Sequence, residues 1–215
     1  SAFAVSDHDT LEGSRRALKK GSEIGLRVIP ALEMSASLKG HVLHILGYYF
    51  DFENAPLNTA LGRIWDYHRA RAETMVHNIN KELIAEHKTP MDIEVIRKIG
   101  ATKPLTRPEL ANYLLELGHV KSRKEAFDRW LVKYDIPNDA LTALEAIHLI
   151  RGAGGVAVLA HPGIASMSLK AITSDFDEQV KILADLKVEG LGGVEVYRYD
   201  HTQEDQQRYL DAARS

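Results

Sequence analysis

Residues 154–162, GGVAVLAHP, form a short apolar run that follows two glycines and ends at His161. The run is rich in β-branched residues and apolar almost throughout, which is typical of a strand buried on both faces. Within it, a strand is predicted at Val156–Ala160, and further runs of this kind are Phe3–Ser6, Arg27–Ser35, Val42–Phe50 and Gly193–Tyr197. The chain is therefore predicted to contain several buried strands.

Amphipathic helical patterns lie between several of these strands, and glycines stand close to where the helices should end. The helical ranges are 11–23, 141–152, 177–187 and 203–213. Because strands alternate with helices, we expect an α/β fold with parallel strand pairing.

The strand pattern disappears between Asn58 and about Ala140, where helical patterns replace it. Two segments, 106–109 and 122–125, have the sequence of a capping box, which marks the beginning of a helix. We expect an all-helical insertion at residues 58–140, between two parts of an α/β core at 1–57 and 141–215. This core is smaller than the about 250 residues of a closed barrel. It is either a small open sheet or, as we favour because the chain begins in a strand and ends in a helix, an incomplete barrel.

The composition narrows the class of partner. The chain has 215 residues, of which 27 are basic and 30 acidic, interspersed to a net charge of -3, so we expect no binding of duplex DNA. No apolar run approaches the about 20 residues of a membrane span, and the first residues lack the charged, apolar and small-residue order of a signal peptide, so we expect a cytoplasmic protein without a membrane partner. The oligomeric state is left open. The chain has no cysteine, so any metal ion would have nitrogen and oxygen ligands.

Imidazole and carboxylate groups stand at or near the ends of the predicted strands. Since the carboxyl ends of strands in α/β proteins form one rim, these groups can converge there. They are the four residues His8, Glu33, His44 and His161, together with Asp7, Asp9 and Glu195. Such a set suits Zn, Mn or Fe better than Mg alone, and a carboxylate such as Glu33 can bridge two ions. Two neighbouring metal ions can hold a phosphoryl oxygen and supply a hydroxide nucleophile.

Each of these residues also has a purely structural interpretation. Asp7 or Asp9, close to Thr10, could cap the helix that begins near Leu11. A lone histidine in an apolar strand, such as His44, is more often a core residue than a ligand. Glu33 could be an ordinary loop carboxylate, although its unpaired burial would cost several kcal/mol. We favour a metal site because the four residues fall on four successive strand segments.

Five segments resemble, in order and spacing, successive motifs of the PHP family, which is named for polymerase and histidinol phosphatase. They are SDHDT at 6–10, VIPALEMS at 28–35, HILG at 44–47, GGVAVLAHP at 154–162 and GGVEVY at 192–197. Within the helical segment, residues 107–108, 117–122 and 125–128 resemble the insertion of the nucleotide-directed branch of this family. That branch includes nucleoside 3',5'-bisphosphate phosphatases, enzymes acting on AMP, and 5'-3' exoribonucleases.

The resemblance implies a distorted (β/α)7 TIM-like barrel, incomplete in this chain, with an all-helical insertion. It also implies two or three divalent metal ions, Mn, Zn or Fe with Mg possible, on the C-terminal rim. There a metal-activated hydroxide would attack a phosphate ester. The residues that match metal ligands are His8, Glu33, His44 and His161. Of these, we expect His8, Glu33 and His161 to be catalytic, with Glu33 bridging two ions.

Three further residues acquire roles through the resemblance. Asp7 is expected to orient a ligand histidine. Arg107 and His201 are expected to hold the phosphate group of the substrate. Glu109 departs from the pattern, because relatives often have histidine there, and this difference is expected to affect substrate preference. The N-terminal His-x-His and C-terminal Ser-Asp-x-His-Gly motifs of the family are missing from this chain, and we expect both to lie beyond its ends.

We therefore expect a metal-dependent phosphoesterase that hydrolyses AMP, a 3',5'-nucleoside bisphosphate or a short oligoribonucleotide. One alternative is a histidinol-phosphate-type phosphomonoesterase with the same metal ions, against which the long insertion argues, because it suggests a larger substrate. The other alternative is a catalytically idle PHP binding module, which would bind little metal.

Overall fold

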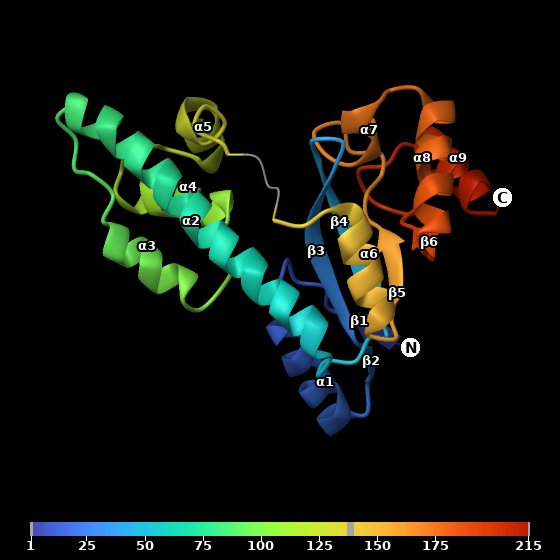
Figure 1. Cartoon of the computed structure of the whole chain (residues 1–215). Helices are drawn as coiled ribbons and strands as arrows, with labels where there is room; N and C mark the ends of the chain where they lie inside the picture. The colour runs from blue at the N-terminus through green and yellow to red at the C-terminus, as the bar shows by residue number, and fades with distance from the viewer. Residues whose placement is uncertain (1, 137–139, 215) are drawn as a thin grey trace. The chain divides into compact units, whose positions relative to one another are not determined.

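The computed structural model describes residues 2–136 and 140–214 (Figure 1). The chain divides into two compact units, Ser1–Leu61 with Asn138–Ser215 and Gly62–Pro137. Helix α2 (Ala55–Ala85) begins in the first unit and continues in the second. In the part of the chain that is described, no helix is long and apolar enough to cross a membrane.

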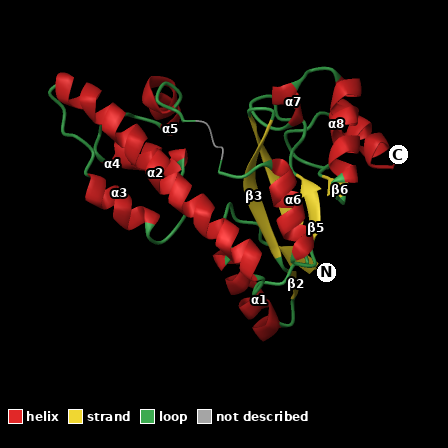
Figure 2. Ribbon diagram, viewed as in Figure 1, coloured by secondary structure: helices red, strands yellow, loops and turns green. Residues whose placement is uncertain are grey.

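The first unit contains two sheets. Strand β1 (Ala2–Ala4) pairs in parallel with β2 (Arg27–Ile29). The second sheet has the order β3 (Ala31–Leu38), β4 (His41–Tyr48), β5 (Val156–Leu159) and β6 (Gly193–Val194). The helices of this unit are α1 (Glu12–Ile24), α6 (Ala143–Gly152), α7 (Leu169–Ile172), α8 (Phe176–Val188) and α9 (Gln203–Arg214). Helix α6 packs across β3, β4 and β5 (Figure 2).

The expectation of parallel pairing is wrong for the centre of the larger sheet. Strands β3 and β4 are antiparallel, because Lys39 and Gly40 both adopt positive φ angles, 50° and 78°, and close a two-residue hairpin turn. Strand β4 is also antiparallel to β5, whereas β5 and β6 are parallel. The predicted strand Arg27–Ser35 is divided into β2 and β3 at Pro30, which has no N–H to donate to a ladder. The α/β class is confirmed in a mixed form.

The strands that the structure describes do not close into a barrel. The two sheets are separate, and an isolated parallel bridge between His8 and Glu33 links the segment after β1 to β3. A second isolated bridge joins Ser37 of β3 to Thr142, at the entry to α6. The first of these bridges brings the segment after β1 beside the beginning of β3, where the candidate site described below lies.

The second unit is built from helices in its described part. In addition to α2 it contains α3 (Ile93–Gly100), α4 (Arg107–Glu116), α5 (Arg123–Ala126) and a π-helix, Phe127–Leu131. Its buried core includes Met75, Ile79, Leu83, Leu114 and Trp130. Apolar residues at helical spacing on α2 thus pack against α4 and the π-helix, which gives this unit a core of its own.

The capping boxes differ from those predicted. Ser122 does accept a hydrogen bond from the Glu125 N–H at 3.1 Å, as expected of an N-cap. The prediction at Thr106 is wrong, since its hydroxyl donates to the Glu109 carboxylate and caps no backbone group. A complete capping box is found instead at the beginning of α6, between Thr142 and residue 145.

The turn between α6 and β5 depends on the absence of a side chain at Gly155. A Cβ atom there would lie 2.9 Å from the Tyr48 carbonyl oxygen and 3.0 Å from that of Ile150. Because both are backbone atoms, Gly155→Ala is expected to lower the free energy of unfolding by about 1–3 kcal/mol. Chemical denaturation measures this change. The matched control is Gly152→Ala, whose Cβ would meet nothing within 4 Å, so we expect a change within about 0.5 kcal/mol. Equal losses in both variants would contradict the argument.

Candidate metal centre

Strands β3 and β4 place Glu33 and His44 on one face of the larger sheet. Glu33 and Ser35 lie two residues apart on β3, so they share a face. The antiparallel register sets His44 directly opposite Ser35, which puts the imidazole on the same face. The His44 Nδ1 atom lies 2.9 Å from Oε1 of Glu33.

His161 reaches the same point from the end of β5. Its Nε2 atom lies 2.9 Å from Nδ1 of His44 and 3.2 Å from Oε1 of Glu33. The residue is 3% exposed, and its Nδ1 atom is buried without a hydrogen-bond partner in the described structure. Its φ angle is 32°, a region that a residue with a Cβ atom adopts rarely and at a cost. The surroundings of His161 must therefore enforce this conformation.

His8 approaches Glu33 from the segment that follows β1. The Glu33 N–H donates to the Asp7 carbonyl at 3.1 Å, and the Asp9 N–H donates to the Glu33 carbonyl at 2.9 Å. This pairing brings Nε2 of His8 to 3.8 Å from Oε2 of Glu33. The two carboxylate oxygens of Glu33 consequently face different imidazoles. Oε2 faces His8, and Oε1 faces His44 and His161.

The electrostatics favour an ionised Glu33 carboxylate beside a neutral His44 imidazole. Burial by itself raises the pKa of Glu33, but hydrogen bonds from His161 and His44 and the nearby His8 hold that pKa well below its usual range. Burial also lowers the pKa of His44, which keeps a nitrogen lone pair available. Deprotonated carboxylates and neutral imidazoles are the forms that bind divalent cations.

The donor set fits a divalent metal ion. Ligand atoms of His8, Glu33 and His44 all lie within 4.8 Å of one another. The buried His161 imidazole adds a fourth donor through Nε2, at hydrogen-bond distance from two of the other groups. Nitrogen and oxygen donors without thiolate suit Zn, Mn and Fe. The structure thus brings together the four residues that the sequence predicts as ligands.

Asp9 has a role that differs from the predicted helix cap. Its side chain is fully buried, and Oδ1 accepts the Ser35 N–H at 2.7 Å. At the beginning of α1 it is the Thr10 hydroxyl that accepts a backbone hydrogen bond, from the Glu12 N–H at 3.3 Å. Asp9 therefore joins the His8 segment to β3, beside Glu33.

The Asp7 and His201 side chains contact parts of the first unit other than the four candidate ligands. The Asp7 carboxylate lies against Gly13 of α1, where a Cβ atom would meet its Oδ2 at 1.9 Å. His201 is buried; its Nδ1 donates to the Val196 carbonyl at 2.9 Å, and its Nε2 accepts the Gly163 N–H at 3.3 Å. Both ring nitrogens are thus engaged, so a phosphate contact would require His201 to release one of them.

Arg107 belongs to the second unit. Its guanidinium donates to Oδ2 of Asp135 at 2.6 Å and lies 5.6 Å from the centre of the Phe127 ring. Arg71 binds the other oxygen of the same carboxylate. Two guanidinium groups therefore share one negative charge, which leaves a local positive excess.

Glu195 contributes to the site through a contact that the sequence alone did not specify. Oε2 of Glu195 accepts the backbone N–H of His161 at 2.8 Å. The sequence places Glu195 in the predicted strand Gly193–Tyr197, among the carboxylates near strand ends, but its hydrogen-bond partner is set by the tertiary structure.

Comparison with known proteins gives relatives that span more than this chain, and no family model matches it. The 5'-3' exoribonuclease Rnm of Escherichia coli is 29% identical over 184 residues, which cover 82% of this chain and 61% of the relative. The 3',5'-nucleoside bisphosphate phosphatase of Chromobacterium violaceum is 27% identical, over 96% of this chain and 70% of the relative. The chain thus spans about three fifths of the length of the exoribonuclease.

A solved structure supports the same relationship. The crystal structure of a candidate metal-dependent phosphoesterase from Bifidobacterium adolescentis superposes with a TM-score of 0.82 at 27% identity. The superposed residues cover 98% of this chain and 72% of the solved chain. The two proteins share a mixed α/β fold.

Proposed function

We propose that this chain carries the metal centre of a PHP-family phosphoesterase that hydrolyses phosphate esters of nucleotides or short oligoribonucleotides. The supporting observation is the convergence of Glu33 with three imidazoles, on a fold shared with a candidate metal-dependent phosphoesterase. The names of the two curated relatives describe hydrolysis of RNA and of a nucleoside bisphosphate. Both substrates contain phosphate esters of a nucleotide.

The residues of the centre have distinct roles in this proposal. His8, Glu33, His44 and His161 would hold two or three divalent cations, Mn, Zn or Fe. Bound cations of this kind polarise a phosphoryl oxygen and lower the pKa of a water molecule. Glu33 is suited to bridging two cations, because its oxygens face different imidazoles. Asp9 keeps the His8 segment in register with Glu33.

The proposal also assigns the surrounding parts of the chain. Residues 1–57 and 141–215 would form the parts of the barrel, and residues 58–140 the helical insertion. Arg107 and His201 would bind the substrate phosphate, and Asp7 would orient a ligand histidine. Planar guanidinium groups bind phosphate through paired hydrogen bonds, and Arg107 would exchange its bond with Asp135 for such a contact.

Comparison of substrates tests the proposal. Hydrolysis of AMP, a 3',5'-nucleoside bisphosphate, a trinucleotide and histidinol phosphate should be measured with Mn²⁺. We expect kcat/KM for the best nucleotide substrate to exceed that for histidinol phosphate by about tenfold or more, because base and ribose add binding energy. A preference for histidinol phosphate would instead favour a small phosphomonoesterase. If the protein shows no turnover and binds no metal, it is an idle binding module.

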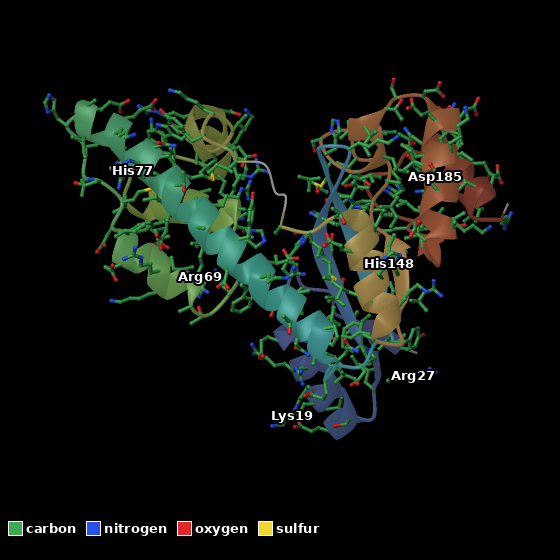
Figure 3. The ribbon with its side chains drawn as sticks, in the orientation of Figure 1. Lys19, Arg27, Arg69, His77, His148 and Asp185 are labelled. Carbon is green, nitrogen blue, oxygen red and sulfur yellow. The ribbon has the colours of Figure 1, made fainter. Side chains whose placement is uncertain are left out.

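Replacement of His161 by alanine is expected to remove bound metal and activity together. Loss of one donor from the centre should reduce kcat/KM by about 100-fold or more, since bound metal supplies several kcal/mol of transition-state stabilisation. Metal analysis and phosphate release measure the two effects. The matched control is His148→Ala on α6, a residue labelled in Figure 3. Its exposed imidazole lies 2.9 Å from the Glu189 carboxylate. Unchanged metal content and turnover in the His161 variant would refute the assignment.

A further inference from the structure

Glu195 stands directly after β6 on the same face of the sheet as the metal centre. The register pairs Val158 of β5 with both Leu46 and Gly193, and Glu33 lies opposite Leu46. The Glu195 N–H continues this ladder by donating to the β5 carbonyl at 159, at 2.9 Å. Because alternate residues share a face, Glu195 projects to the same side as Glu33.

The carboxylate of Glu195 binds the backbone of His161. Its Oε2 atom accepts the His161 N–H at 2.8 Å, where β5 has ended and the backbone turns. The φ angle of 32° at His161 carries a cost of about 1–3 kcal/mol for a residue with a Cβ atom. A charge-assisted hydrogen bond to the amide of this residue offsets part of that cost.

A cation lies near the Glu195 carboxylate without being needed as its hydrogen-bond partner. Arg198 NH1 lies 3.7 Å from the oxygen that accepts the His161 N–H, and Arg198 Nε donates to Asp200 at 2.8 Å. The Glu195 side chain is 29% exposed, so its charge is shared with Arg198 and only partly with water. The segment after β6 thus forms a short chain of contacts that ends at the amide of His161.

We propose that Glu195 is a positioning residue that holds the His161 backbone in its left-handed conformation, so that the His161 imidazole meets Glu33 and His44. This inference rests on the proposed function, because it assigns the metal centre a support beyond its ligands. Residues that orient ligands contribute to metal affinity without touching the metal.

Two variants test the role, because they differ in what they retain. Glu195→Gln keeps a side-chain oxygen that can accept the His161 N–H, whereas Glu195→Ala removes it. We expect the alanine variant to bind Mn²⁺ about 10- to 100-fold more weakly and the glutamine variant to stay within about threefold of the wild type. Calorimetric titration of the purified, metal-free protein with Mn²⁺ measures these affinities.

A second measurement follows the contact itself. In the metal-free protein, hydrogen exchange at the His161 amide is expected to be about tenfold faster or more in Glu195→Ala than in the wild type, and close to wild type in Glu195→Gln. Arg198→Gln is the matched control, because it removes the ion pair and leaves the acceptor of the amide in place. We expect this control to change Mn²⁺ affinity by less than about threefold.

The outcomes separate this inference from the proposed function. Wild-type Mn²⁺ affinity in Glu195→Ala, or equal loss in both Glu195 variants, would overturn the positioning role. If the alanine variant does not fold, a loss of tenfold or more in Glu195→Gln overturns it, and retained affinity supports it. A protein with normal Mn²⁺ binding but no phosphoesterase activity would refute the proposed function and leave the positioning role standing.

Discussion

Glu33→Gln is expected to lower kcat/KM for nucleotide substrates by about 1,000-fold or more, because bound metal contributes several kcal/mol to phosphoester hydrolysis. Glutamine keeps the size of the side chain but removes its charge. It also places an NH₂ group among imidazole nitrogens that lie 2.9 Å and 3.2 Å from one carboxylate oxygen. An uncharged amide cannot bridge two cations as a carboxylate does. Metal analysis of the purified variant should show a parallel loss.

The control for this variant is Glu189→Gln. Glu189 also lies 2.9 Å from an imidazole, that of His148, but this pair is exposed to solvent. Surface pairs of this kind contribute about 0–1 kcal/mol, so we expect metal content and turnover to stay at wild-type values. Retained metal and turnover in Glu33→Gln would show that the convergence of imidazoles on Glu33 has only a structural role.

Trp130→Ala is expected to lower the free energy of unfolding of the helical unit by about 3–5 kcal/mol. The Trp130 side chain is fully buried in the core of this unit, and its Nε1 donates to Oε2 of Glu82 at 2.8 Å. The substitution leaves a large cavity and removes one partner of a carboxylate. Urea denaturation followed by circular dichroism measures the loss.

Val132→Ala is the control for the helical core. Val132 follows the π-helix directly but is 62% exposed, so we expect its replacement to change stability by no more than about 0.5 kcal/mol. Equal losses in the two variants would contradict the core position of Trp130. All four candidate ligands lie in the first unit, so Mn²⁺ affinity is expected to survive Trp130→Ala under conditions where the protein remains folded.

Features that depend on neighbouring residues in the sequence could be predicted closely. The pattern at 177–187 predicts a helix that the structure places at Phe176–Val188, and the pattern at 203–213 one found at Gln203–Arg214. Strand β5 was predicted at 156–160 and is Val156–Leu159. Helical periodicity and apolar runs act over a few residues, so the local sequence contains the information that sets them.

Strand direction and side-chain partners could not be predicted in the same way. Antiparallel pairing of β3 and β4 requires a positive φ angle at Lys39, a residue type that rarely adopts one. Asp9 was interpreted as a helix cap because a nearby amide was available, but its partner is the Ser35 N–H, 26 residues away. A local motif competes with distant partners that become available only after the strands have paired.

By itself, the sequence determined which imidazoles and carboxylates lie on or directly after the strands, and hence the kind of chemistry the chain can support. Tertiary structure decided that Oε1 of Glu33 meets His44 and His161 while Oε2 faces His8. It also decided that the strained backbone of His161 is held by Glu195, 34 residues away. The physical reason is that these contacts depend on strand register and on individual φ angles, and both are set by the packing of the whole unit.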